Sequence, residues 1–84
     1  MDEISQDQIL EKLTSIFRDL LDDEEIILTR ESTAQDIEEW DSLNQIKIIL
    51  ECENIFQVKL RARDIRNLNN VGEMVEHLFY LRRL

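Results

Sequence analysis

The chain contains no proline and only one glycine in 84 residues, and this shortage of turn-forming residues constrains its fold more than any other feature. A sheet protein needs repeated tight turns, which glycine, proline and related residues supply. Hydrophobic residues make up 43% of the chain, which suits the modest core of one small domain covering residues 1–84. We therefore predict an all-α fold without strands, in which helices are joined by polar loops.

The charge of the chain is strongly negative and unevenly distributed. The formal net charge is −9, and residues 1–53 contain sixteen acidic and four basic side chains, whereas residues 54–84 contain three and six. A field of this sign repels nucleic acid and anionic membranes and attracts basic protein surfaces, although acidity can also serve solubility alone. No apolar stretch is long enough to span a bilayer, and the acidic N-terminus is unlike a signal peptide. With Cys52 as the only cysteine, these features predict a cytoplasmic monomer without a disulfide.

Two segments in the first two thirds of the chain carry apolar residues at helical spacing. Residues 5–21 begin with a capping box, in which Ser5 caps the helix and the Gln8 side chain reaches back to accept a hydrogen bond from the Ser5 backbone N–H. Residues 42–56 form the second predicted helix. We expect these helices to share one core with the C-terminal part of the chain.

The C-terminal third contributes one main helix and one short helix. Asn69 or Asn70 can cap a helix whose basic end, at Arg82 and Arg83, suits the negative pole of the helix dipole. Residues 60–68 have a weaker apolar pattern and predict only a short helical turn. The expected architecture is a small bundle of three main helices plus one short helix. The side chains expected to be largely buried are Phe17, Ile48, Cys52, Phe56, Val75 and Phe79.

A loop of about twenty residues separates the first two predicted helices, and loops of this length in small domains are often functional. Its acidic start, residues 22–25, lacks the glycine and the closing glutamate of an EF-hand loop, so it is interpreted as a solvated charge run. Ile26, Ile27, Leu28 and Ile37 are the expected anchors of the loop on the core.

The second helix carries two apolar stripes on nearly opposite faces. The stripe expected in the core consists of Ile48, Ile49, Cys52, Ile55 and Phe56. Leu43, Ile46 and Leu50 recur at i, i+3 and i+7 on the other face. This second stripe is predicted to be an exposed docking surface for a partner, and the alternative is a helix packed on both sides.

Ser42 lies where the acidic loop meets the second helix, directly after Asp41. A hydroxyl at this point is near the positive end of the helix dipole, which favours a neighbouring anion. The only histidine, His77, is far away in sequence, so Ser42 has no nearby base to activate it as a nucleophile. We therefore predict that Ser42 is an attachment point for a phosphate-linked group. The alternative is a purely structural serine that caps the helix with Gln45, although Asp41 can serve as the cap instead.

This order of elements, with Asp41-Ser42-Leu43 opening the second helix, resembles the acyl carrier protein family over nearly the whole chain. The resemblance implies that Ser42 bears a 4′-phosphopantetheine arm, transferred from coenzyme A by a phosphopantetheinyl transferase. The thiol of that arm would hold an acyl group as a thioester, as in fatty acid or polyketide biosynthesis, so the protein would have no catalytic residue and no metal. The transferase would recognise a surface that also binds acyl-loading, ketosynthase or acyltransferase enzymes with basic docking surfaces. This surface would consist of Asp41, Leu43, Ile46 and Leu50.

The chain departs from the carriers of fatty-acid synthesis at several positions. Trp40 replaces a glycine, Asn44 and Lys47 replace acidic residues, and residues 59–66 are basic where the family is typically acidic. These departures indicate a specialised, free-standing carrier for a dedicated pathway, such as secondary metabolism or surface-polysaccharide modification. The alternatives are a peptidyl or aminoacyl carrier, an acidic adaptor that is never modified, and a small hydrolase that uses Ser42.

Three other residues receive structural interpretations. Cys52 is expected to be a small buried hydrophobe and not a reactive thiol. His77 lacks a carboxylate or cysteine at ligand spacing, so it is expected at the surface or core boundary and not as a metal ligand. Trp40 is expected to tuck the loop against the bundle, and the alternative is an exposed contact.

Overall fold

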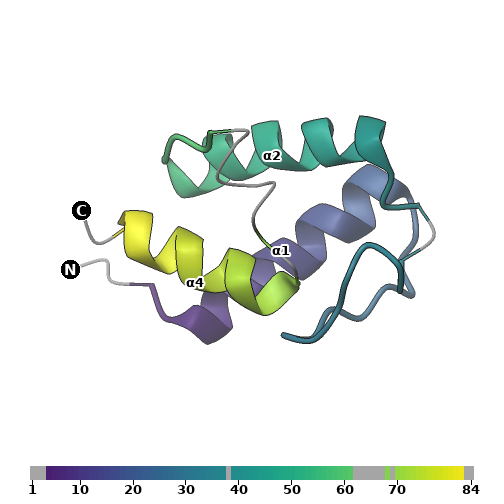
Figure 1. The fold of residues 1–84 in the computed structure, drawn as a ribbon, viewed down its shortest axis with the longest axis horizontal. Helices are drawn as coiled ribbons and strands as arrows, with labels where there is room; N and C mark the ends of the chain where they lie inside the picture. The colour runs from purple at the N-terminus through teal and green to yellow at the C-terminus, as the bar shows by residue number, and fades with distance from the viewer. Residues whose placement is uncertain (1–3, 38, 62–67, 69, 83–84) are drawn as a thin grey trace.

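The computed structural model describes residues 4–37, 39–61, 68 and 70–82, and these form three helices and no strand (Figure 1). The helices are α1 (Gln6–Leu21), α2 (Ser42–Phe56) and α4 (Val71–Arg82). Helix α1 crosses the molecule and lies against both α2 and α4, while the long loop after α1 covers one end of the bundle (Figure 1). The all-α prediction is confirmed. Most of the segment predicted to contain a short helix, residues 62–67 of 60–68, lies outside the described residues.

The first and last helices begin at side chains that satisfy their free backbone N–H groups. Ser5 caps α1 in a capping box, because the Gln8 N–H donates to Ser5 Oγ at 3.2 Å and the Ser5 N–H donates to Gln8 Oε1 at 2.9 Å. Asn70 caps α4, since its Oδ1 accepts from the Glu73 N–H at 2.9 Å. The predicted capping box is therefore confirmed, and Asn70 acts as the cap of the last helix.

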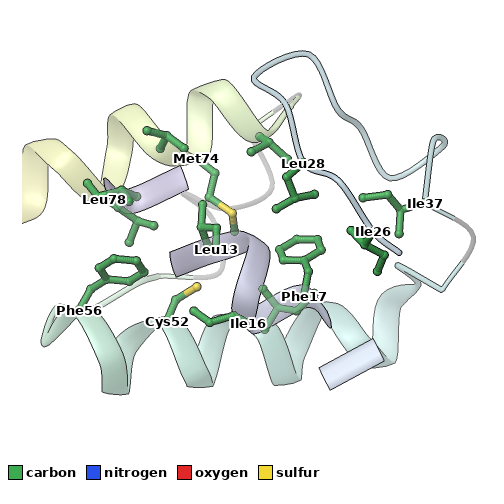
Figure 2. Packing of buried hydrophobic residues seen from close by; sticks show 14 of the residues in the cluster. Leu13, Ile16, Phe17, Ile26, Leu28, Ile37, Cys52, Phe56, Met74 and Leu78 are labelled. Atoms are coloured by element: carbon green, nitrogen blue, oxygen red, sulfur yellow. The ribbon is translucent and has the colours of Figure 1, made fainter. Parts of the chain in front are cut away.

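The core lies where α1, α2, α4 and the loop converge, and Figure 2 shows their apolar side chains pointing into one interior. Of the six side chains predicted to be buried, Phe79 is only partly buried, because it lies at the edge of the inward face of α4. The prediction for Ile55 is wrong, since 41% of this residue is exposed. It lines an open groove of about 240 Å³ between α1 and α2, at the margin of the buried stripe. The residues confirmed as buried are Phe17, Ile48, Cys52, Phe56 and Val75.

The long loop is held to the core by three of its four predicted apolar anchors. Ile26, Leu28 and Ile37 are buried, and Figure 2 shows Ile26 beside Ile37 at the loop end of the core. The prediction for Ile27 is wrong, because 75% of this residue is exposed. Residues 26–28 lie outside any helix, and in an extended segment successive side chains point to opposite sides. Two neighbours of Ile27 therefore face the core while Ile27 faces solvent.

The loop also covers the first turn of α4. The N–H groups of Val71 and Gly72 donate to the carbonyl oxygens of Ser32 and Arg30, each at 2.8 Å. A Cβ atom at Gly72 would lie 2.9 Å from the Arg30 carbonyl oxygen, closer than real Cβ contacts. The only glycine of the chain is therefore the residue that allows the loop backbone to approach this helix closely.

Two arginines tie the same loop to α1. Arg30 Nη1 donates to Gln6 Oε1 at 3.0 Å, and Arg30 Nη2 lies 3.6 Å from Asp7 Oδ1. Arg18 Nε donates to the Ile26 carbonyl oxygen at 2.8 Å. Both ends of α1 are thus connected to the loop. None of the helices in the described parts of the chain combines the length and apolarity that a membrane crossing requires.

Candidate functional site

The first turn of α2 is capped by Asp41. Its backbone is extended, with φ −107° and ψ −176°, and its Oδ1 accepts from the Asn44 N–H at 2.9 Å. The Asp41 carbonyl oxygen accepts the first helical hydrogen bond, from the Gln45 N–H at 2.8 Å. Ser42 is then the first residue of the helix itself. Of the two caps that the sequence allowed, the structure uses Asp41, so the capping role does not fall on Ser42.

The segment before Ser42 is held in place by Trp40. The indole is half-buried and lies edge-on to the Phe17 ring, with the ring centroids 4.8 Å apart and an interplanar angle of 89°. Trp40 Nε1 donates to Gln45 Oε1, so the side chain of Gln45 supports the loop. Asn44 Nδ2 also reaches back, to the Glu39 carbonyl oxygen at 2.8 Å. The predicted tucking of Trp40 is confirmed, and two side-chain contacts of α2 together with the Phe17 ring of α1 fix the approach to Ser42.

The N-terminus of α2 provides a favourable place for an anion. The Asp41 side chain bonds the N–H of Asn44, and the first helical hydrogen bond uses the N–H of Gln45. The N–H groups of the first two helical positions, Ser42 and Leu43, take part in neither of these bonds. The first turn contains no acidic residue, so the carboxylate of the cap Asp41 is the acidic group that α2 places at its own positive pole. A phosphodiester on a side chain at the first helical position fits these groups.

The two apolar stripes of α2 are separated in the structure as the sequence predicts. Leu43, Ile46 and Leu50 are 65%, 57% and 60% exposed, whereas Ile48 and Cys52 on the other face are fully buried. The exposed three define a surface that we call the α2 strip. It begins one residue after Ser42 and extends over two turns of the helix. A helix packed on both sides is thereby excluded.

Neither Cys52 nor His77 adds a reactive group to this site. Burial raises the pKa of the Cys52 thiol to about 12, helped by the carboxylates of Glu51 and Glu53, so the thiol stays protonated and inert. His77 is partly buried at the core boundary, and its Nε2 has no hydrogen-bond partner among the described residues. Across the same residues, no group of three or more His, Cys, Asp or Glu side chains is arranged to hold a metal ion.

Comparison with known proteins decides the family. A phosphopantetheine attachment site matches residues 11–78, which is most of the chain. The solution structure of a holo acyl carrier protein from Geobacter metallireducens is similar, with a TM-score of 0.80 and 38% identity over 86% of this chain and 83% of that chain. The chain belongs to the acyl carrier protein family. It is accordingly a carrier and not an enzyme, and its cofactor is a covalently bound 4′-phosphopantetheine.

Sequence patterns did not reveal how this carrier holds its attachment region. The contacts of Gln45 with Trp40 and of Asn44 with Glu39 each span five residues, across the junction of loop and helix. Spacings of three and four residues are the ones that signal contacts within a helix, so these pairs have no periodic signature. The polar residues at positions 44 and 45, after a capping aspartate, were the only available signal.

Proposed function

We propose that this carrier bears its 4′-phosphopantetheine arm on Ser42 and holds an acyl group on the arm as a thioester. The observation that supports this most is the start of α2, where Asp41 acts as the cap and Ser42 occupies the first helical position. A structural role for Ser42 as the cap would compete with modification, and Asp41 removes the need for that role. The transferase supplies the chemistry of attachment, so Ser42 requires no base of its own.

Asp41 and the α2 strip are the proposed recognition surface for the transferase and for acyl-loading, ketosynthase or acyltransferase enzymes. The strip exposes 57–65% of each of three large apolar residues to solvent. Apolar area that a partner buries contributes about 25 cal/mol per Å², so a few such side chains can anchor a transient complex. The acidic loop and the net charge of −9 steer enzymes with basic docking surfaces towards the carrier.

The proposed setting is a dedicated pathway in the cytoplasm, where the carrier acts as a monomer. A single buried cysteine suits a reducing compartment. The positions at which the chain departs from the carriers of fatty-acid synthesis, including Trp40 and Lys47, favour a specialised set of enzymes over the general ones. An aminoacyl or peptidyl carrier would use the same arm with different loading enzymes, and it is the alternative within this family.

The deciding experiment is incubation of the purified protein with coenzyme A and a broad-specificity transferase, followed by intact-mass measurement. We expect the mass to rise by one phosphopantetheinyl group in the wild type and not in Ser42→Ala. Ser15→Ala is the matched control, since Ser15 is an exposed serine on α1. An unchanged wild-type mass, under conditions that modify a control carrier, would refute the proposal and favour an unmodified adaptor.

A second step identifies the type of cargo. The loaded arm is offered an acyl donor or an aminoacyl adenylate, each with its own loading enzyme, and the thioester is detected by mass. Acylation without aminoacylation is the result expected for an acyl carrier. Aminoacylation alone would assign the protein to the runner-up class while leaving the assignment of Ser42 intact.

A further inference from the structure

Lys47 is a charged residue beside the α2 strip. It is exposed and lies four residues after Leu43, one after Ile46 and three before Leu50. Residues three and four apart are neighbours on a helix surface, so Lys47 lies beside Leu43 and Leu50, along one edge of the apolar strip. A partner that covers the strip must also accommodate this positive charge.

None of the described residues forms an ion pair with Lys47. Glu51 follows it by four residues, in the less favourable order for a helical pair, and lines the groove between α1 and α2. Glu53 accepts a hydrogen bond from the Leu60 N–H at 2.8 Å, so it stabilises the turn after α2. The charge of Lys47 is therefore available to a second molecule.

Basic side chains are rare in this part of the chain, and two of the others have structural partners. Residues 1–53 contain sixteen acidic and four basic side chains. Arg18 and Arg30 hold the loop through the contacts described above. Lys47 is the basic residue beside the strip, so its position there is a distinctive feature of the strongly acidic first part of the chain.

We propose that Lys47 is a specificity-determining residue, which selects a partner enzyme that presents a carboxylate beside an apolar groove and rejects one with a basic side chain there. This inference rests on the proposed function, because it concerns enzymes that act on the arm at Ser42. Asp41 and Lys47 are six residues apart, which is about 9 Å along a helix that rises 1.5 Å per residue. The matching partner surface has a basic group near Ser42 and an acidic group about 9 Å further along the axis of α2, beside the strip.

Charges of opposite sign give the complex a defined orientation, which the apolar strip alone does not. Hydrophobic contact is non-directional, so the strip alone can bind in either orientation. Asp41 and Lys47 form an ordered pair of charges, which only one orientation of a complementary partner can satisfy. A basic group opposite Lys47 would be repelled, and repulsion of a wrong partner is as much a source of specificity as attraction of the right one.

The test uses a phosphopantetheinyl transferase whose carrier-binding surface is basic as the probe. The kcat/KM for loading is measured for the wild type, Lys47→Gln and Lys47→Glu at low and high salt. Lys59→Glu is the matched control, because Lys59 is exposed, lies beyond the end of α2 and undergoes the same change of charge. We expect Lys47→Glu to raise kcat/KM about three- to tenfold at low salt, Lys47→Gln to be intermediate, and Lys59→Glu to change it less than about twofold.

A second arm tests the preference for a carboxylate directly. The basic residues on the carrier-binding surface of the transferase are replaced by glutamate one at a time. We expect at least one of these transferases to load the wild-type carrier better than Lys47→Glu, which reverses the order seen with the parent enzyme. That reversal would identify the group that faces Lys47.

The outcomes separate the two proposals. If all variants are loaded on Ser42 with equal kcat/KM, or if Lys59→Glu changes it as much as Lys47→Glu, the role of Lys47 is refuted and the carrier function stands. If no transferase variant reverses the order, the preference for a carboxylate is refuted. Absence of loading in every variant overturns the proposed function, and the role of Lys47 with it. Circular dichroism and thermal unfolding confirm that the compared variants are equally folded.

Discussion

Replacement of Asp41 separates the stability of α2 from recognition of the attachment site. Asp41→Ala removes the oxygen that accepts from the Asn44 N–H at 2.9 Å, and Asp41→Asn keeps an oxygen at this position but removes the charge. Asparagine and aspartate are comparably good caps, whereas alanine is a poor one. The two variants therefore differ in the cap and share the loss of the carboxylate.

The expected magnitudes follow from the exposed position of Asp41. Because the freed N–H group can be hydrated, the loss is that of an exposed cap, about 1 kcal/mol in Asp41→Ala. Loss of the negative charge near the helix N-terminus adds about 0.3–1 kcal/mol to both variants. Ser42→Ala removes no cap and raises the helix propensity at the first helical position, so it should change stability by less than about 0.5 kcal/mol. A difference of 1 kcal/mol shifts Tm by roughly 4–8 °C in a domain of this size.

The assay is urea unfolding, followed by helical circular dichroism and by the fluorescence of Trp40, which packs beside this turn. We expect Asp41→Ala to be the least stable variant, Asp41→Asn to lie between it and the wild type, and Ser42→Ala to be nearly unchanged. A greater loss in Ser42→Ala than in Asp41→Ala would refute the assignment of the cap. If the proposed role of Asp41 in recognition is correct, Asp41→Asn will also lower the rate of arm attachment although its helix is still capped.

Four further predictions concern the packing and the buried thiol. Gly72→Ala should destabilise the fold by about 1–2 kcal/mol in urea unfolding. The Cβ atom would lie 2.9 Å from the Arg30 carbonyl oxygen, and the cost of this close contact outweighs the better helix propensity of alanine. A gain in stability would show that the loop shifts easily to make room. Leu50→Asp should weaken loading of the arm with little change in Tm, whereas Ile48→Asp should unfold the protein; similar Tm losses in both would show that the strip is core. The Cys52 thiol should react with alkylating reagents only through unfolding at pH 8, so a rate unaffected by added denaturant would contradict its burial. The raised pKa of this thiol also predicts a contribution to stability that is constant below about pH 9 and is lost as pH rises from about 9 to about 12, because the unfolded state ionises first.

Local patterns in the sequence were sufficient for the helices. Residues 42–56 were predicted as a helix with the same bounds that the structure has, and the capping box of Ser5 and Gln8 placed the start of α1. Helical periodicity and caps are properties of neighbouring residues, so a single sequence contains them. The exposed face of α2 was predictable for the same reason, since its two stripes lie on opposite sides.

Contacts between distant segments could not be predicted in this way. Nothing in the pattern of residues 22–41 indicated that the Arg30 carbonyl oxygen meets the N–H of Gly72, although the single glycine was a signal in retrospect. Ile55 was misplaced because hydrophobicity alone does not distinguish the edge of a core from its centre, and Ile27 because the alternation of an extended segment is not visible in a run of three apolar residues. The choice between Asp41 and Ser42 as the cap was left open by the sequence, since both residue types cap helices well.

The anchoring of the long loop has a consequence for the speed of carrier exchange. A free chain loses about 1–2 kcal/mol of conformational entropy for each backbone residue that becomes fixed. In this protein Ile26, Leu28 and Ile37 are already buried, and the loop backbone is bonded to α4. An arriving enzyme therefore meets a preformed platform around the start of α2, and neither its arrival nor its departure requires the loop to fold or unfold. A small contact area is then enough for binding, and the complex can dissociate quickly, which suits a protein that must visit several enzymes in succession.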